Sequence, residues 1–99
     1  MNILIWNVRG LNDPLKQKRV VDRIRSMKIM LVGLLETRVK EYNSQSIINK
    51  YFQGWKWAHN YSTAYNGRIW VLCVVYMAHN IQVKELIRGV AEWREGNEQ

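Results

Sequence analysis

The strongest constraint on the fold is a strand–helix–strand pattern at the start of the chain. Residues 2–7 form a short apolar run with β-branched and aromatic side chains, which is typical of a buried strand. Asp13 and Pro14 mark a helix start, because a capping side chain precedes a proline at the first helical position. A helix is expected over 14–28, and the continuous apolar run at 29–35 predicts a strand covered on both faces. Together these elements predict a βαβ unit with parallel strands and a right-handed crossover.

The predicted helix is amphipathic and basic. Val20, Ile24 and Met27 follow one another at helical spacing and form one apolar stripe. Residues 9–28 carry seven basic and two acidic side chains, and so hold most of the excess in a chain whose net charge is +7. A basic segment of this kind indicates a polyanionic partner, most commonly nucleic acid. The alternative is a solvated helix face without a ligand.

The rest of the chain continues the alternation of helix and strand. Its patterns predict a helix at 43–52, a half-buried strand at 55–61, a central apolar strand at 68–77, a further strand at 80–83 and a helix at 85–94. The chain has 99 residues, of which 47% are hydrophobic and 23% charged. These values are those of one small α/β domain or a piece of a larger one.

Composition also bears on location. The longest apolar run, at residues 69–78, is about half of what a membrane-spanning helix needs. The first residues lack the basic segment and long apolar stretch of a secretory signal. The single cysteine excludes an internal disulfide. We therefore expect an intracellular protein, in the nucleus or the cytoplasm, with no membrane partner.

A candidate site follows from the βαβ geometry. The carboxyl ends of two parallel strands meet at the same edge of a sheet, so Asn7 and Glu36 are expected to converge there. One carboxylate, together with water and a bound phosphate, can hold Mg²⁺. Arg9 and the first turn of the following helix lie near the same edge and could contact a phosphate. The alternative is that Asn7 begins a turn and that Glu36 is an exposed charge at a strand end.

Several short motifs resemble a known family. Residues 5–11 (IWNVRGL) resemble the first motif of the endonuclease/exonuclease/phosphatase superfamily, and residues 34–38 (LLETR) resemble its second motif. Within that superfamily, residues 12–16 (NDPLK) and the basic helix resemble the branch found in plant LINE-type (non-LTR) retrotransposons. The stretches GW, NYS and YNGRIWV between residues 54 and 71 fit the same branch. The resemblance covers about residues 2–72.

The resemblance implies a four-layer α/β sandwich and cleavage of nucleic acid phosphodiesters that depends on Mg²⁺ or Mn²⁺. It implies that Glu36 binds the metal and that Asn7 orients the metal site and the phosphate. No ligand role carries over to Arg9, because other branches often have an acidic residue at this position. The basic side chains expected to contact nucleic acid, DNA above all, are Arg9, Lys16, Arg19, Arg23 and Arg68.

The chain also departs from the family pattern. The later Asp-x-Asn and Ser-Asp-His motifs are missing, and no aspartate follows Asp22. A base to activate water and a partner for the leaving oxygen are therefore lacking. From Cys73 onward the likeness fades. We expect residues 1–78 to be the N-terminal part of such a domain, residues 79–99 to be a divergent tail with helical character, and the whole to be a catalytically incomplete remnant.

Two other functions stay open. One is a nucleic-acid-binding module without catalysis, supported by the basic helix. The other is self-association, because the missing half of the family's domain supplies the second sheet and its loss would uncover an apolar face of the first. The tail could also cover that face.

Some residues have a plainer interpretation. Trp55 and Trp57 could stack nucleic acid bases, but aromatic residues at period two more often belong to a core. Cys73 is expected to be an inert buried thiol. The two histidines lack the spacing of a zinc site. The methionines at positions 27, 30 and 77 are expected to fill the core.

Overall fold

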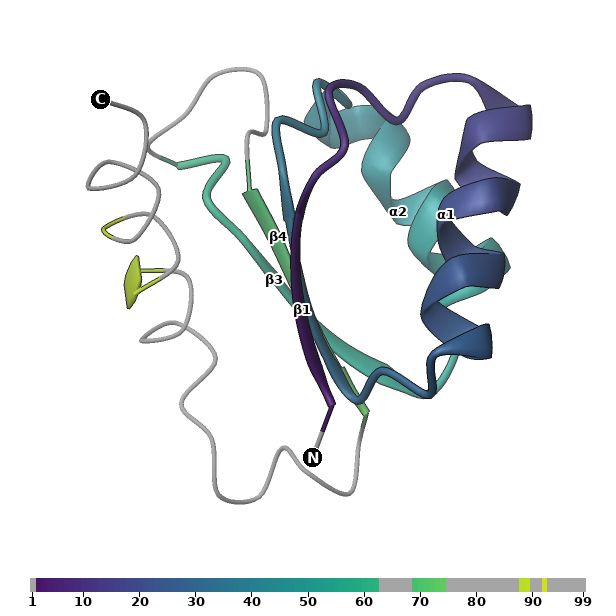
Figure 1. The fold of residues 1–99 in the computed structure, drawn as a ribbon. Coiled ribbons are helices and arrows are strands. Elements are labelled where there is room, and N and C mark those ends of the chain that lie inside the picture. The colour runs from purple at the N-terminus through teal and green to yellow at the C-terminus, as the bar shows by residue number, and fades with distance from the viewer. Residues whose placement is uncertain (1, 63–68, 75–87, 90–91, 93–99) are drawn as a thin grey trace.

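The computed structural model describes residues 2–62, 69–74, 88–89 and 92 (Figure 1). Its main elements are β1 (Ile3–Asn7), α1 (Pro14–Ser26), β2 (Leu31–Leu35), α2 (Glu41–Tyr51), β3 (Trp55–His59) and β4 (Ile69–Val74). The strands form one sheet in the order β1-β2-β4-β3. β1 is parallel to β2, and the other two pairs are antiparallel. The predicted α/β class, the parallel βαβ pair and the interior position of β4 are confirmed.

Both helices cover the same face of the sheet (Figure 1). The core between the helices and the sheet is apolar. Its buried members include Val20, Val21 and Ile24 from α1, Ile47 and Ile48 from α2, and Val32, Leu34, Trp70 and Leu72 from the sheet. All five residues of β2 are buried, as expected for a strand covered on both faces. The helices thus pack mainly on the central strands of the sheet, and β1 lies at one edge.

The start of α1 follows its sequence signal. The Asp13 side chain accepts a hydrogen bond from the Leu15 N–H at 3.2 Å, and Pro14 is the first helical residue. The sequence predicts that α2 starts at residue 43, whereas the helix starts two residues earlier, at Glu41. Lys40 precedes the helix and makes no side-chain cap. A helix that begins without a capping side chain carries no local marker of its first residue.

The end of α1 explains why the second strand begins later than predicted. The Lys28 N–H donates to the Arg25 carbonyl at 3.1 Å, and the Ile29 N–H donates to the Ile24 carbonyl at 3.0 Å. This pair of bonds is a Schellman motif, in which the residue after the cap takes a left-handed conformation. Lys28 has φ +53° accordingly. The Ile29 N–H is bonded to the end of the helix, so β2 begins only at Leu31.

Replacing Lys28 with glycine should therefore stabilise the protein by about 1 kcal/mol, because glycine adopts the left-handed conformation without the Cβ penalty. Lys18→Gly is the matched control, since it places the same change inside α1 and should destabilise by about 1 kcal/mol. Urea unfolding followed by circular dichroism measures both. A loss of stability in Lys28→Gly would contradict the assignment of this helix end.

The apolar stripe on α1 is shorter than predicted. Met27 is 41% exposed, so the expectation that it fills the core is wrong. It is the C-cap residue of α1, beyond the last helical turn, and it lines a groove beside β1. Met30 is only half buried. Met77 lies outside the described residues.

The second face of the sheet is only partly uncovered. The register places Ile5, Gly33, Val71 and Ala58 in one row on the face opposite the helices. On that face the side chains from β2 and β4 are buried, namely Leu31, Leu35, Ile69, Val71 and Cys73. On β1, however, Ile3 is 56% and Ile5 is 37% exposed. The apolar face predicted to lie open is therefore exposed along β1 and not over the central strands.

The C-terminal predictions are described only in part. The strand predicted at 80–83 lies outside the described residues, as do residues 68 and 75–77 of the strand predicted at 68–77. Of the helix predicted at 85–94, Arg88, Gly89 and Glu92 are described, and all three are helical. Arg88 Nε lies 4.0 Å from Glu92 Oε1, across one turn. No helix in the described part of the chain combines the length and the hydropathy that crossing a membrane requires.

Candidate functional site

The segments that follow β1 and β2 run side by side at the carboxyl ends of these strands. Asn7 is the register partner of Leu35, the last residue of β2. The Val8 N–H donates to the Leu35 carbonyl at 3.0 Å, and the Gly10 N–H donates to the Glu36 carbonyl at 2.7 Å. The parallel pairing therefore continues beyond the strands. It brings Asn7 and Glu36 to one edge of the sheet, as the sequence predicted, and we call the segments 7–11 and 36–40 the rim.

The rim backbone adopts an unusual conformation. Arg9, Glu36 and Arg38 have φ values of +52°, +54° and +56°, and Gly10, in the first segment, has φ +99°. The left-handed region disfavours residues with a Cβ by about 1–2 kcal/mol each. Residues held in such conformations cluster at binding and active sites, where the surrounding structure fixes them. The rim is thus a candidate site on backbone geometry alone, independently of its motifs.

Side chains from β1 and α1 connect to the rim backbone. The Arg9 N–H donates to Asn7 Oδ1 at 3.2 Å, which is the turn that the plainer interpretation of Asn7 predicts. Lys16 Nζ donates to the Arg9 carbonyl at 3.2 Å, so this lysine reaches from the first turns of α1 back to the rim. Asn7, Arg9, Lys16 and Glu36 are therefore close neighbours along one edge.

Further polar side chains hold the rim in place, and sequence reasoning gave them no role. Asn12 Nδ2 donates to the Arg38 carbonyl at 2.9 Å, and Gln17 Nε2 donates to the Leu11 carbonyl at 3.0 Å. Tyr61 Oη donates to the Val39 carbonyl at 2.6 Å. These bonds join residues far apart in sequence, so no spacing pattern announces them.

The rim combines one carboxylate with several cations. Glu36 is half buried, whereas Arg9 and Arg38 are exposed. Within the described residues, no group of three or more His, Cys, Asp or Glu side chains could hold a metal ion. The Glu36 carboxylate and the Asn7 amide are oxygen donors of the kind that Mg²⁺ and Mn²⁺ prefer. Such a donor set suits a metal held jointly by the protein, water and a phosphate, rather than by the protein alone.

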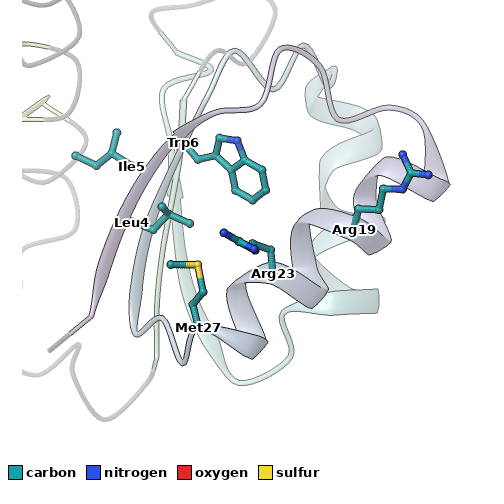
Figure 2. Close-up of a pocket in the computed structure, with 6 residues that line it drawn as sticks. All are labelled: Leu4, Ile5, Trp6, Arg19, Arg23 and Met27. Atoms are coloured by element: carbon teal, nitrogen blue, oxygen red, sulfur yellow. The ribbon is translucent and has the colours of Figure 1, made fainter.

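The structure separates the other predicted contacts from the rim. Arg19 and Arg23 lie further along α1 and line a groove beside β1, with Leu4, Ile5, Trp6 and Met27 as its other lining residues (Figure 2). The groove has a volume of about 540 Å³. Arg68 lies outside the described residues. The predicted cationic surface is thus two features, the rim and the groove.

The plainer interpretations of the aromatic residues hold. Trp55 and Trp57 pack against the core, and their rings meet Phe52 and Trp70 edge to face at 5.6 and 5.9 Å. Such packing favours a core role over a stacking platform.

The expectation that Cys73 is a buried thiol is confirmed, and His59 makes a local backbone contact. His59 Nδ1 accepts a hydrogen bond from the Tyr61 N–H at 3.3 Å. Cys73 is buried, and burial raises the pKa of its thiol above the ordinary 9.0, which keeps it protonated and unreactive at neutral pH.

Comparison with known proteins adds no family assignment. No protein-family model matches the chain, and no curated protein is significantly similar to it. The resemblance to the endonuclease/exonuclease/phosphatase superfamily is carried by the short motifs alone.

Proposed function

We propose that this chain is a remnant of a metal-dependent nucleic acid endonuclease that binds nucleic acid at the rim without cleaving it. The observation that carries the proposal is the paired course of segments 7–11 and 36–40, which gathers Asn7, Arg9, Lys16 and Glu36 at one edge. These are the residues on which the two family-like motifs and the predicted phosphate contacts fall.

The chemistry of the rim suits a phosphodiester. Arg9 and Lys16 offer charged donors to phosphate oxygens, and the Glu36 carboxylate offers a ligand to a divalent cation. A bound Mg²⁺ would neutralise the phosphate that it shares with the carboxylate. Without the cation, Glu36 repels the same phosphate. The rim therefore acts as a metal-dependent contact rather than as a simple basic patch.

Catalysis is not part of the proposal. The sequence has no aspartate after Asp22, and the family's Ser-Asp-His motif is missing. Apart from Glu36, which the proposal assigns to the metal, the segments 7–11 and 36–40 hold no carboxylate or imidazole that could act as a base to activate water. In this proposal the four strands represent part of the first sheet of a four-layer sandwich, and residues 1–78 represent the N-terminal part of the domain.

The test is binding of a short DNA duplex, measured by fluorescence anisotropy with Mg²⁺ or with chelator. In Mg²⁺, Glu36→Gln should bind about tenfold more weakly than the wild type, because a charged contact is worth about 1.5 kcal/mol or more. In chelator the order should reverse, because the variant no longer repels phosphate. Glu41→Gln is the matched control; it removes an exposed carboxylate in the first turn of α2 and should leave the Mg²⁺ effect unchanged.

Nicking of supercoiled plasmid completes this experiment. Neither protein should cut DNA above background. Nicking that requires both Mg²⁺ and Glu36 would show that the site is catalytically complete. Binding that does not respond to Mg²⁺ in the wild type would remove the metal from the proposal.

The second candidate is a nucleic-acid-binding module that uses α1 alone. The observation in its favour is that Arg19 and Arg23 are exposed and lie away from the rim. In that case Arg19→Ala/Arg23→Ala would weaken DNA binding and reduce its salt dependence, whereas Arg9→Ala/Lys16→Ala would have little effect. The rim proposal predicts the opposite ranking.

A further inference from the structure

The outer edge of β1 has hydrogen-bonding groups that no described strand uses. β1 pairs with β2, and β2 lies on one side of it only. The Asn2 carbonyl and the Val8 N–H both bond to the β2 side. Because successive residues of a strand direct these groups to alternate sides, the N–H and C=O groups of Ile3 and Ile5 point to the outer edge. Such an edge is a template for an additional strand.

The two sides of this edge differ in chemistry. On the face away from the helices, the Ile3 and Ile5 side chains are exposed. On the helix face lies the groove, with Leu4 and Trp6 on β1 and the arginines on α1. Figure 2 shows Arg23 extending from α1 toward Trp6, whereas Ile5 projects to the opposite face. An added strand would therefore place alternate side chains in a basic groove and over an aliphatic surface.

The spacing of the two arginines matches a strand. α1 runs back along β1, because Asn2 Nδ2 donates to the Met27 carbonyl at 3.1 Å near the end of the helix. Arg19 and Arg23 are four residues apart, which is about 6 Å along a helix axis. Two residues of a strand span about 6.7 Å. Acidic side chains at alternate positions of an added strand thus match the spacing of the two arginines. Arg23 extends toward β1, and Arg19, which extends away from it in Figure 2, must turn toward the strand to make its contact.

We propose that the β1 edge binds an extended, acidic peptide segment of another protein by strand addition. Its acidic side chains occupy alternate positions and contact Arg19 and Arg23 in the groove. The intervening aliphatic side chains pack on Ile3 and Ile5. Backbone hydrogen bonds supply affinity in this mode of recognition, and the alternating side chains supply specificity.

A second copy of this chain and a nucleic acid strand each match only one of these two features, the edge or the groove. In a second copy paired antiparallel through β1, both α1 helices would lie on the same face of the joined sheet, and their arginines would face one another without acidic partners. A nucleic acid strand would suit the arginines but lacks the regular amide groups that match the edge. An acidic peptide satisfies both the edge and the groove.

The test uses a blocked peptide of sequence Thr-Val-Glu-Val-Glu-Val-Thr and calorimetric titration. A peptide of the same composition with adjacent glutamates, which lie on opposite faces of a strand, is the control. Arg19→Ala/Arg23→Ala should weaken binding of the alternating peptide about tenfold, because both exposed ion pairs with the glutamates are lost. Lys18→Ala/Lys50→Ala removes the same charge at exposed positions outside the groove and should leave the affinity unchanged.

Amide hydrogen exchange locates the peptide. Binding should slow exchange at the Ile3 and Ile5 N–H groups, while Leu4 and Trp6, whose amides face β2, should change little. Equal binding of both peptides, or binding without protection of Ile3 and Ile5, would overturn the proposal. An oligonucleotide that binds more tightly than the peptide and abolishes the heat of peptide binding would assign the groove to nucleic acid. Protection of Ile3 and Ile5 that grows with protein concentration alone would assign the edge to a second copy.

Discussion

Replacing Trp70 with alanine should lower the free energy of unfolding by about 3–5 kcal/mol, the range seen for truncation of large buried aromatic side chains. Trp70 is fully buried in β4, where it stands beside Leu34 of β2 and His59 of β3. Its Nε1 donates to Tyr61 Oη at 3.1 Å. Alanine would leave a cavity under the helices and remove that donor. Small domains are stable by only about 5–15 kcal/mol, so a large part of the stability would be lost.

Urea unfolding followed by circular dichroism measures this effect. Tyr42→Ala is the control, because Tyr42 is 78% exposed and its removal should change stability by less than about 0.5 kcal/mol. A cost below about 1 kcal/mol for Trp70→Ala would mean that this side chain is not in a packed core.

Replacing Tyr61 with phenylalanine should cost about 1–3 kcal/mol, although the ring is retained. The Tyr61 hydroxyl donates to the Val39 carbonyl and accepts from Trp70 Nε1. Phenylalanine would leave both of these buried groups without a partner. Val39 belongs to the rim segment that carries Glu36, so the loss should also loosen the candidate site. Faster amide exchange across residues 36–40 in Tyr61→Phe would show this loosening.

The cost of Tyr61→Phe should depend on pH. Burial raises the pKa of Tyr61 above its ordinary 10.0, while hydrogen bonds with the side chains of Trp70, Ser44 and Thr37 act in the opposite direction. The folded state keeps this proton at pH values where the unfolded chain has lost it. Wild-type stability is therefore complete below pH 10 and falls as the pH rises through the folded pKa.

The phenylalanine variant lacks this loss, so the difference between the two proteins should narrow above pH 10. The raised pKa of Cys73 acts in the same direction, but it is common to both proteins and cancels in the comparison. Unfolding curves at matched pH values from 7 to about 11 measure the difference. A difference that widens above pH 10 would contradict a raised pKa for Tyr61.

These two residues connect the core to the site. Trp70 lies in the sheet, Tyr61 follows β3, and Val39 lies in the rim. Their hydrogen bonds form a continuous link from the central strand to the segment that holds Glu36. The left-handed conformation of Glu36 and Arg38 requires support of this kind, because neither residue would adopt it readily alone.

Local signals predicted much of the fold. Asp13 and Pro14 marked the start of α1, and the continuous apolar run located β2. The predicted boundaries differ from the observed ones where a tertiary or capping contact decides where an element begins or ends. Ile29 ends a helix rather than beginning a strand, because its N–H closes the Schellman motif. Met27 is exposed because it follows the last turn of α1, at the edge of the sheet.

In the candidate site, too, local sequence signals predicted one part and tertiary contacts decided the other. Parallel strands necessarily direct their carboxyl ends to one edge, so the convergence of Asn7 and Glu36 could be predicted from two apolar runs and the helix between them. The sequence could not predict that Arg19 and Arg23 lie away from that edge, because their position depends on how far α1 runs back along β1.

The sequence by itself determined the α/β class, the parallel βαβ pair, the basic character of α1 and the edge at which the rim would form. Each of these depends on residues near one another in the chain, through periodicity, capping and strand direction. Only the tertiary structure decided which groups support the rim, which face of β1 stays exposed and where the groove lies. These features depend on contacts between residues far apart in the chain, such as Tyr61 with Val39 and Asn12 with Arg38. Sequence spacing does not predict such contacts, because they form only when the helices and the sheet have packed.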